Sequence, residues 1–386
     1  MKKGWEILPL ADMCEFQRGL TYSKGDEAEF SGNVVLRANN VDLLTNQLDL
    51  SGLKYISDQI QIPSSKVLKP GSLLVCTASG SKSHLGKVAF VDKEYGYAFG
   101  GFMGQITPLP SILPRFLFHA LTSEAYKKFI SALSDGANIN DLKFDDLARF
   151  QVPVPPLPEQ QRIVALLDEA LAGLATAKAN AERNLQNARK ALESHLESIF
   201  SQRGEGWIET TLDKISTNLD SRRIPITKSA RSSGEYPYYG ASGIVDYVDD
   251  YIFEGDNLLV SEDGANLLAR STPIAFSVSG RYWVNNHAHI LHFDDMATQR
   301  YVEFYLESIK LDEYITGAAQ PKLNQKALNA IPIPIPERIE EQAEIVLSIE
   351  GLQKETQHLS QIYERKLAAL EELKKSLLQQ AFNGEL

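Results

Sequence analysis

The sequence predicts a mixed α/β chain in which two globular domains are separated by two long helices that form an antiparallel coiled coil. Two observations predict this fold class. Residues 148–164 and residues 329–346 repeat one pattern, in which alternating aliphatic residues and prolines lead through a Glu-Gln pair into a helix. Short β-like runs precede both patterns, and each helical pattern continues for about forty residues. The period is too long for a solenoid, so it indicates a duplicated unit of one globular domain and one long helix.

Residues 1–157 are expected to form the first domain. Three aliphatic runs bounded by Gly, Ser and Asn predict strands, at residues 34–37, 73–76 and 88–91. A helix is predicted over 114–131, where Phe116, Leu117, Ala120 and Leu121 share one face. The segment 152–158 is rich in proline, which removes backbone donors, so we expect an extended exit segment rather than a central strand or a helix.

Residues 158–205 are expected to form the first spacer, with a helix over roughly 159–201. Its apolar positions recur in steps of three and four, as in a coiled-coil seam. The predicted seam residues are Ile163, Leu167, Ala170, Leu174, Ala177, Ala181, Leu185, Ala188, Leu192, His195 and Ile199. The many alanines allow a neighbouring helix to approach closely.

Residues 206–339 repeat the scheme of the first domain. Gly206-Trp207 echoes Gly4-Trp5, strands are predicted at 258–260 and 273–276, and a helix is predicted near 299–315. The run 332–336 alternates isoleucine with proline and is expected to be a second extended exit segment.

Residues 340–386 are expected to form the second spacer, a helix over roughly 340–382. Its predicted seam residues are Ile345, Ile349, Leu352, Thr356, Leu359, Tyr363, Leu367, Leu370, Leu373, Leu377 and Ala381. Two seams of equal length in one chain most simply pair with each other. Duplicated units related by a local two-fold axis place the two helices antiparallel.

The composition is typical of a cytoplasmic, globular protein with two domains. The chain has 386 residues, of which 43% are hydrophobic and 23% charged. We expect no membrane span, because no apolar run reaches about 18 residues, and no signal peptide at the N-terminus. Cys14 and Cys76 are too few for a disulfide framework, so we expect two buried thiols.

The charge is acidic overall and unevenly distributed. The net charge of −11 argues against nonspecific coating of nucleic acid. Residues 206–339 carry 12 Lys/Arg and 18 Asp/Glu. Two stretches, 59–91 and 221–234, contain four basic residues each and no acidic residue, so each is either a phosphate contact or a solvated loop.

Local motifs for catalysis, nucleotides or metals are lacking. The segment Gly80–Val88 approaches a phosphate-binding loop, but its first glycine is misplaced and Val88 stands where Ser or Thr is needed. His287, His289 and His292 lie in an alternating, strand-like run, and neither cysteine nor carboxylate completes a ligand set there. We therefore predict a non-enzymatic chain without a metal site or a cofactor of its own.

Polar loops between the short strands are the remaining candidates for function. They supply amides, hydroxyls, imidazoles, and Lys or Arg, which are groups that read base edges and hold phosphates. Each loop alone is an ordinary turn, and the prediction depends on their clustering in both halves. The candidate DNA-binding residues are Arg37, Asn39, Asn40, Ser79, Ser81, Lys82, His84 and Lys87, and then Arg222, Arg223, Lys228, Tyr239, Ser242, Asp263, Asn266, Asn286, His287 and Lys322.

Seven short motifs follow one another in a fixed order along the chain. They are Trp5–Leu10, Gly71–Gly86, Val154–Gln160, Tyr236–Gly243, Glu262–Ala265, Val284–His289 and Ala319–Leu323. The chain closely resembles the specificity subunits of type I restriction–modification systems. The resemblance lies in these motifs, in the duplicated unit of domain and helix, and in the spacing of the two long helices. The resemblance covers nearly the whole chain.

The resemblance implies two target-recognition domains, residues 1–157 and 206–339, each reading one half of a split, asymmetric sequence in double-stranded DNA. It also implies that the helices dock two methyltransferase subunits and set the gap between the half-sites. Restriction and translocase subunits are further partners. The cofactors then belong to the partners: S-adenosylmethionine for adenine-N6 methylation, and ATP and Mg²⁺ for translocation and cleavage.

Three alternatives compete with this interpretation. A DNA-modifying enzyme with recognition domains of its own needs a methyltransferase or nuclease motif, and the sequence has none. A coiled-coil scaffold needs no base-reading loops. A specificity subunit of another phage-defence methyltransferase system is the nearest alternative, and the sequence leaves it open.

Overall fold

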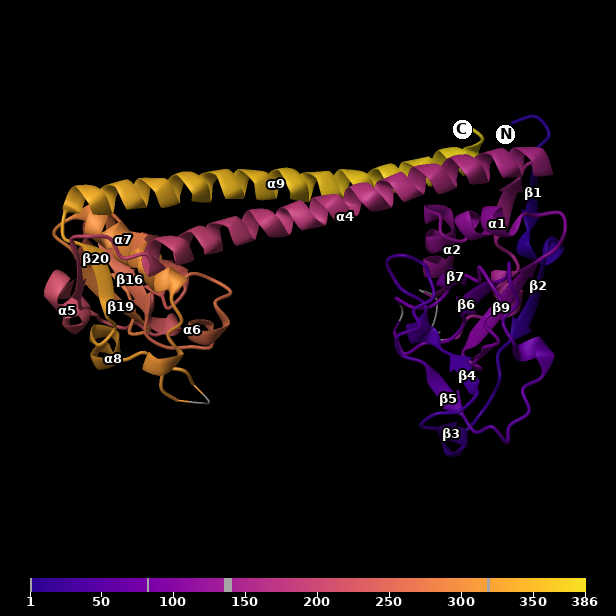
Figure 1. The fold of residues 1–386 in the computed structure, drawn as a ribbon, viewed down its shortest axis with the longest axis horizontal. Helices are drawn as coiled ribbons and strands as arrows, with labels where there is room; N and C mark the ends of the chain where they lie inside the picture. Colours follow the sequence, from indigo (N-terminus) through magenta and orange to yellow (C-terminus); the bar gives the residue numbers. More distant parts are fainter. Residues whose placement is uncertain (1, 82, 135–140, 318–319) are drawn as a thin grey trace. The chain divides into compact units, whose positions relative to one another are not determined.

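A computed structural model describes residues 2–81, 83–134, 141–317 and 320–386. The chain divides into two compact units. Unit 1 comprises Met1–Ala181 and Arg365–Leu386, and unit 2 comprises Glu182–Glu364. Each unit is a β-rich domain with segments of two long helices packed against it (Figure 1). Within the part of the chain that the structure describes, no helix combines the length and apolar character that a membrane crossing needs.

The domain of unit 1 is built on two four-stranded sheets and one two-stranded ribbon. The first sheet is antiparallel, in the order β2 (Cys14–Arg18), β9 (Met103–Pro108), β6 (Leu73–Cys76), β7 (Val88–Phe90). The second has the order β3 (Glu27–Ala28), β5 (Lys54–Ile56), β4 (Asn33–Leu36), β8 (Ala98–Phe99), and in it β4 and β8 are parallel. The ribbon pairs β1 (Glu6–Pro9) with β10 (Gln151–Val154). The first exit segment therefore begins as an outer ribbon, which tolerates its prolines.

The helix predicted over 114–131 is two helices, α1 (Pro114–Ala120) and α2 (Glu124–Ser134). The hydroxyls of Thr122 and Ser123 donate to the carbonyls of His119 and Ala120, which ends α1. Ser123 also accepts a hydrogen bond from the backbone N–H of Tyr126 and so caps the start of α2. The prediction of a continuous helix was wrong because periodicity does not register such side-chain caps. A short helix, α3 (Phe144–Leu147), follows.

The domain of unit 2 repeats this plan. Its first sheet has the order β12 (Thr217–Asn218), β19 (Ala288–His292), β16 (Asn257–Ser261), β17 (Ala275–Val278) and is antiparallel. Its second has the order β14 (Gly243–Val248), β13 (Ser233–Gly240), β18 (Arg281–Val284), β15 (Phe253–Glu254), with β13 and β18 parallel. The ribbon pairs β11 (Trp207–Thr210) with β20 (Ile333–Pro336).

Four helices of unit 2 lie between these strands in sequence. They are α5 (Leu212–Ile215), α6 (Asn266–Ala269), α7 (Met296–Ser308) and α8 (Gln325–Asn329). The helix predicted near 299–315 is α7, which begins earlier because the Asp295 carboxylate caps the N–H groups of Ala297 and Thr298. The 3-10 helices of the two units are η1 (Leu10–Asp12), η2 (Lys24–Asp26), η3 (Ala38–Asn40), η4 (Ser64–Lys66), η5 (Asp220–Arg222), η6 (Lys228–Ala230) and η7 (Asp312–Tyr314).

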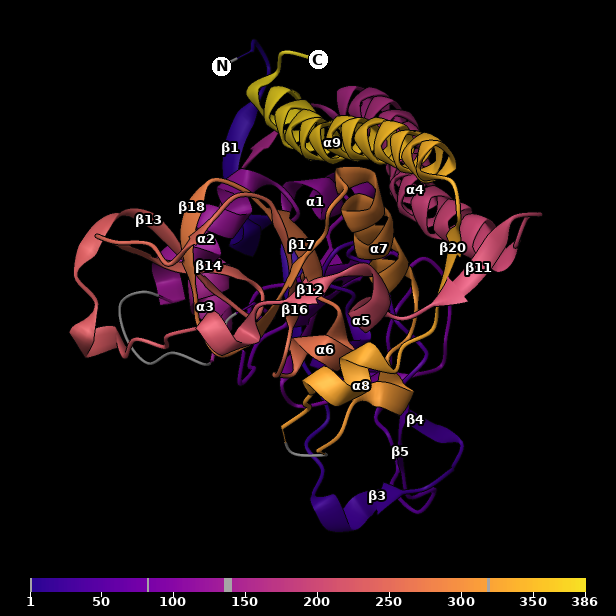
Figure 2. The ribbon, with the colours of Figure 1, turned by 90° about the vertical axis from the view of Figure 1, so that its left-hand side faces the viewer.

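The long helices α4 (Leu157–Ser201) and α9 (Ile339–Asn383) run antiparallel (Figure 1 and Figure 2). In unit 2, Arg189 of α4 forms an ion pair with Glu364 of α9, and His195 of α4 lies within hydrogen-bond distance of the Ser348 hydroxyl of α9. Residue numbers rise along α4 while those of their partners fall along α9, as antiparallel packing requires. All predicted seam residues of α4 are buried or half-buried, which confirms that seam. In α9, Leu359 and Leu373 are instead 41% and 48% exposed. A single partner helix covers only one side of the broad apolar stripe of α9.

The ends of the long helices complete the core of each domain. In unit 1, Ile163 and Leu167 of α4 and Ala381 of α9 join the core formed by the first sheet and α1. In unit 2, Phe200 of α4 packs edge-on against Tyr301 of α7. Burying one such aliphatic or aromatic side chain contributes roughly 1.5–3 kcal/mol. Each helix is therefore anchored by apolar burial wherever it meets a domain.

A buried glutamine repeats at the start of each long helix. The Gln160 side chain accepts from the N–H of Leu113 and donates to the carbonyls of Ser111 and Pro155. Gln342 accepts from the Thr298 hydroxyl and donates to the Pro336 carbonyl. An ion pair recurs eight residues later on each helix, Arg115–Asp168 in unit 1 and Arg300–Glu350 in unit 2. The duplication therefore extends to the polar contacts that hold each domain on its helix.

The two cysteines are free and buried, as predicted. Burial raises the pKa of the Cys14 thiol to about 12 and that of Cys76 to about 11. Both are therefore protonated, unreactive parts of the core of unit 1.

Candidate functional site

Equivalent backbone hydrogen bonds define one edge of the sheets in each unit. The N–H of Thr77, after β6, donates to the carbonyl of Phe102, just before β9. The N–H of Glu262, after β16, donates in the same way to the carbonyl of His287, just before β19. The next bond also repeats, from Leu142 to Thr77 and from Leu323 to Glu262. Thr77 therefore corresponds to Glu262, and Phe102 to His287.

The second sheet of each unit brings its loops to the same edge. Strands β4 and β8 are parallel, and the N–H of Gly100 donates to the carbonyl of Leu36, so the loops after both strands meet. Strands β13 and β18 are parallel as well, and the N–H of Asn285 donates to the carbonyl of Tyr239. We call these loops the loop edge. It comprises residues 37–40, 77–79 and 100–102 in unit 1, and residues 240–242, 262–264 and 285–287 in unit 2.

A half-buried charge network lies behind the loop edge of unit 2. Arg223 donates to Glu262 at 2.7 Å and lies 3.4 Å from Asp220. Lys322 lies 3.2 Å from the other oxygen of Glu262. His289, which is 1% exposed, contacts the Asp220 carboxylate through Nδ1 at 2.5 Å and the Leu323 carbonyl through Nε2 at 2.8 Å. The network joins four segments that are distant in sequence.

Both carboxylates of this network are held in the ionised form. Burial by itself raises the pKa of Asp220, but His289, the N–H of Ile290 and Arg223 together outweigh it, so the pKa lies below its ordinary value. Burial likewise opposes ionisation of Glu262, and Arg223, His289 and Lys322 together hold its pKa below the usual range. The two carboxylates therefore balance two permanent cations.

Asp220, Glu262 and His289 place one ligand atom each within 4.8 Å of one another. The expectation that no carboxylate accompanies these histidines was wrong, because the carboxylates come from segments far from the histidines in sequence. Arg223 and Lys322 already neutralise both acids. A divalent cation next to those two cations is electrostatically disfavoured, so the cluster serves as an internal ion-pair network.

Exposed polar groups face outward from the network in unit 2. The side chains of His287 and Lys322 are 47% and 51% exposed. The Nδ1 atom of His287 lies 2.9 Å from both carboxylate oxygens of Asp263. Asn286, which adjoins His287, and Ser242, between β13 and β14, are exposed. The fold therefore brings five predicted residues to one edge: Ser242, Asp263, Asn286, His287 and Lys322.

Other predicted residues of unit 2 have structural contacts. Arg223 is part of the charge network, and the ring of Tyr239 packs against Tyr282. Asn266 is bound to Thr272 through both its amide nitrogen and its carbonyl oxygen. Arg222 lies over the Phe253 ring and is exposed, and Lys228 is exposed on η6, away from the strand ends of the loop edge.

In unit 1, the predicted residues after β4 divide into two kinds. Asn40 is 1% exposed, and its amide binds the N–H of Arg37 and the carbonyls of Asp49 and Gly52, so it has no group left for a ligand. Asn39 is exposed. Arg37 is half-buried, and its Nε has no hydrogen-bond partner among the described residues.

The predicted residues after β6 form a hydroxyl-rich loop. The Ser79 hydroxyl accepts from the N–H of Ser81, whose own hydroxyl meets Ser83 at 2.7 Å. The Nδ1 atom of His84 lies 3.4 Å from Ser83. Lys87 donates to the carbonyl of Leu43 and so braces a neighbouring loop. Lys82 lies outside the described residues.

Sequence reasoning missed Phe102, which is 72% exposed at the loop edge of unit 1. An aromatic residue in the run Gly100-Gly101-Phe102 was the available signal. The Thr77 hydroxyl, behind this edge, is buried without a hydrogen-bond partner among the described residues. At the position equivalent to His289 stands Gly104, against which the Phe144 ring packs. The two loop edges thus share a backbone and differ in chemistry.

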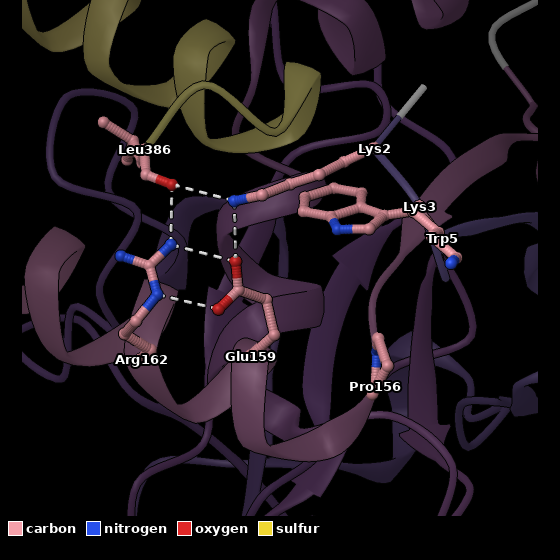
Figure 3. Close-up of a pocket in the computed structure, with 7 residues that line it drawn as sticks. All are labelled: Lys2, Lys3, Trp5, Pro156, Glu159, Arg162 and Leu386. Atoms are coloured by element: carbon pink, nitrogen blue, oxygen red, sulfur yellow. Dashed lines mark hydrogen bonds and ion pairs between the residues drawn. The ribbon is translucent and has the colours of Figure 1, made fainter.

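A hollow next to the chain ends is separate from the loop edge of unit 1 (Figure 3). It is lined by Lys2, Lys3, Trp5, Pro156, Glu159, Arg162 and Leu386. Most of its charges are paired, since Glu159 binds both Lys2 and Arg162, and Arg162 also donates to the carbonyl of Leu386. These contacts anchor the start of α4, and among the described residues that line the hollow, Lys3 is the charged residue without an ion pair.

Comparisons with known proteins agree with the duplication. The family described as "Type I restriction modification DNA specificity domain" matches residues 2–183 and again 204–371. The chain is 26% identical to the EcoKI specificity subunit of Escherichia coli (strain K12) and 25% identical to the StySPI specificity subunit of Salmonella potsdam. Each of these alignments covers 100% of this chain and 90% of the relative.

Two solved structures share the fold. A chain from a structure titled "Structural basis underlying complex assembly and conformational transition of the type I R-M system" superposes with a TM-score of 0.79, at 17% identity, covering 100% of this chain and 99% of that one. The HsdS subunit from Thermoanaerobacter tengcongensis gives a TM-score of 0.64 at 18% identity, covering 100% and 98%. At 17% and 18% sequence identity, these similarities show that the fold is shared and nothing further.

Proposed function

This chain belongs to the family of type I restriction modification DNA specificity domains, and from that premise we propose that it reads both halves of a split, asymmetric DNA sequence. It is a specificity subunit of a type I restriction–modification system, the non-catalytic kind of subunit in such a complex. We assign one half-site to residues 1–157 and the other to residues 206–339. The helical segments 158–205 and 340–386 hold the two recognition domains apart.

The observation that carries the proposal is the repeated loop edge. The same backbone hydrogen bonds build it twice, so a duplicated chain presents two loop surfaces from equivalent positions. The side chains differ, with Phe102 and Thr77 in unit 1 against His287 and Glu262 in unit 2. Equivalent frames with different side chains are what an asymmetric target of two half-sites requires, because base edges are read by side-chain chemistry.

The proposed DNA contacts are polar residues that are exposed or half-buried, and most of them lie at or near a loop edge, whereas Lys228 lies away from it. They are Arg37, Asn39, Ser79, Ser81 and His84 in unit 1, and Arg222, Lys228, Ser242, Asp263, Asn286, His287 and Lys322 in unit 2, with Lys82 kept as a prediction from the sequence. We assign Asn40, Lys87, Arg223, Tyr239 and Asn266 to holding these loops in place, because their polar groups or rings already have partners within the protein.

The partners follow from the family and from the acidic balance of the chain. With a net charge of −11, the chain gains from partners that enclose the DNA and supply positive charge. We propose two methyltransferase subunits, one for each copy of the repeat, which methylate adenine N6 with S-adenosylmethionine. Restriction and translocase subunits would use ATP and Mg²⁺. All of these act on DNA in the cytoplasm.

Methylome sequencing of a host that carries this chain with its methyltransferase tests the proposal. The expected result is methylation of one split, asymmetric motif that disappears when the chain is deleted. A motif that is continuous, or that persists without the chain, contradicts it.

Native mass spectrometry tests the stoichiometry separately. The expected complex contains two methyltransferase subunits for each specificity chain. Saturation at one methyltransferase per chain contradicts the two-fold interpretation.

A further inference from the structure

We propose that Phe102 and His287 are the specificity-determining pair that makes the two half-sites different. Phe102 contacts the methyl group of a thymine in one half-site, and His287 accepts a hydrogen bond from the exocyclic amine of a cytosine or adenine in the other. The inference rests on the proposed function, and it names the chemistry of one base position in each half-site.

The two side chains occupy one position of the repeated fold. Each residue directly precedes the strand at the centre of its first sheet, β9 or β19. Each backbone carbonyl accepts the N–H of the residue that follows β6 or β16. Each side chain is exposed, at 72% for Phe102 and 47% for His287. The two domains therefore present different side chains from the same backbone position, so the bases that they can recognise differ.

Both positions are held rigidly in place. The N–H of Met103 donates to the carbonyl of Gly100, so Phe102 lies in a closed turn, and its carbonyl accepts from both Thr77 and Ala78. The N–H of His287 donates to the side-chain oxygen of Asn285, which is itself buried. A backbone held in this way loses little further freedom on binding, which suits both positions to presenting a side chain to a base.

Phe102 has a ring and no hydrogen-bonding group, so it is suited to apolar recognition. In the major groove the only apolar group that distinguishes bases is the thymine methyl, which phenylalanine is known to contact in protein–DNA complexes. Exposure alone does not single out this ring, since Phe30 is 81% exposed elsewhere in unit 1, and it is the place of Phe102 on the loop edge that points to a base. We therefore assign a thymine to the base pair that Phe102 meets.

His287 has a defined tautomer. Its Nδ1 lies 2.9 Å from both oxygens of Asp263, and a carboxylate has only lone pairs to offer, so Nδ1 carries the hydrogen. In the neutral imidazole the outward Nε2 is then an acceptor. An acceptor selects an amine, and the major groove offers amines only at N4 of cytosine and N6 of adenine.

Base analogues test each contact directly. The complex of the full chain with its methyltransferase is titrated with duplexes that carry the motif found by methylome sequencing. Replacing the relevant thymine with deoxyuridine removes only the methyl group, and should weaken binding about 4-fold, the equivalent of one buried methyl or methylene. Replacing the relevant adenosine with purine 2′-deoxyriboside, or the cytosine with an analogue lacking N4, should weaken binding about 5- to 150-fold, because the Nε2 acceptor is left buried without its partner.

Variants of the protein complete the cycle. Phe102→Ala should bind the thymine and deoxyuridine duplexes equally, and His287→Ala should be indifferent to the amine. Phe30→Ala is the matched control in unit 1, since Phe30 is 81% exposed but precedes β4, at the opposite end of that strand from the loop edge. His292→Ala is the control in unit 2, at the far end of β19. Both controls should retain the full analogue effect.

The outcomes are separable. If the unmodified complex shows no sequence preference at all, the proposed function fails. If it shows a preference, and Phe102→Ala or His287→Ala keeps every analogue effect in its half-site, the inference is overturned for that residue. If 7-deazapurine at the base pair where His287→Ala relaxes the preference weakens binding, and loss of the amine there does not, Nε2 is a donor and the tautomer argument is overturned. The analogue series on the unmodified chain does not depend on the folding of any variant.

Discussion

The buried glutamine at the start of each long helix offers the sharpest test of how the domains are held on the helices. Gln160→Met keeps the volume of the side chain and removes its amide. The change leaves the Leu113 N–H and the carbonyls of Ser111 and Pro155 without their partner. Gln342→Met removes two contacts, to the Thr298 hydroxyl and to the Pro336 carbonyl.

The expected cost follows from the burial of the groups left behind. The Pro155 carbonyl is bonded in a buried position, and an unpaired buried group costs about 1–3 kcal/mol. The other two groups are partly open to water, so each lost bond costs about 0.5–1 kcal/mol. Gln160→Met should therefore destabilise unit 1 by about 2–5 kcal/mol. Gln342→Met, with one bond fewer, should destabilise unit 2 by about 1.5–4 kcal/mol.

Urea unfolding monitored by tryptophan fluorescence measures both values. The three tryptophans are Trp5 in unit 1 and Trp207 and Trp283 in unit 2, so variants with Phe at either set report one unit at a time. Gln161→Met is the matched control, because the neighbouring Gln161 is exposed, and it should change stability by less than about 0.5 kcal/mol. If Gln160→Met unfolds like this control, the glutamine does not hold the domain on the helix.

Three further predictions use other parts of the chain. Four residues inserted near Ala177 lengthen α4 by about 6 Å, which approaches two base pairs at about 3.4 Å each. Methylome sequencing should therefore find unchanged half-sites separated by a wider gap, and binding should be weaker. Undiminished methylation of the original spacing would show that α4 does not set the gap between the half-sites. Burial holds the pKa of His119 below its ordinary value of 6.5 despite the opposing contact with Asp168. The contribution of His119 to the stability of unit 1 should therefore be full above pH 6.5 and fall as the solution is acidified below it, because the unfolded state takes up the proton first. The melting temperature of His119→Gln should depend less on pH between 7.5 and 5 than that of the unmodified chain, and an equal dependence contradicts the assignment. Glu262→Gln should destabilise unit 2 by about 2–4 kcal/mol at pH 7, because Arg223 and Lys322 lose their shared charged partner. Urea unfolding measures this loss of stability, with Glu254→Gln as the exposed control. If Glu262→Gln costs no more than the control, the charge network does not stabilise unit 2.

The sequence by itself determined the parts of this protein that depend on local pattern. The duplication, the extents of α4 and α9, the seam of α4 and the two buried thiols all follow from residues near one another in the chain. The spacing of apolar residues along a helix indicates which face is buried, whatever packs against that face. The Glu-Gln pair that opens each helix was visible in the same way, although its hydrogen bonds were not.

Only the tertiary structure decided which polar residues meet. Asp220, Glu262, His289 and Lys322 come from four segments, and no local pattern says that they form one network. Asn40 and Asn39 are neighbours of one residue type, yet one is buried among carbonyls and the other is exposed. Phe102 became the counterpart of His287 only through backbone hydrogen bonds between strands that are about 25 residues apart in each unit. The physical reason is that strand pairing is a long-range choice of register, and register decides which side chains share an edge.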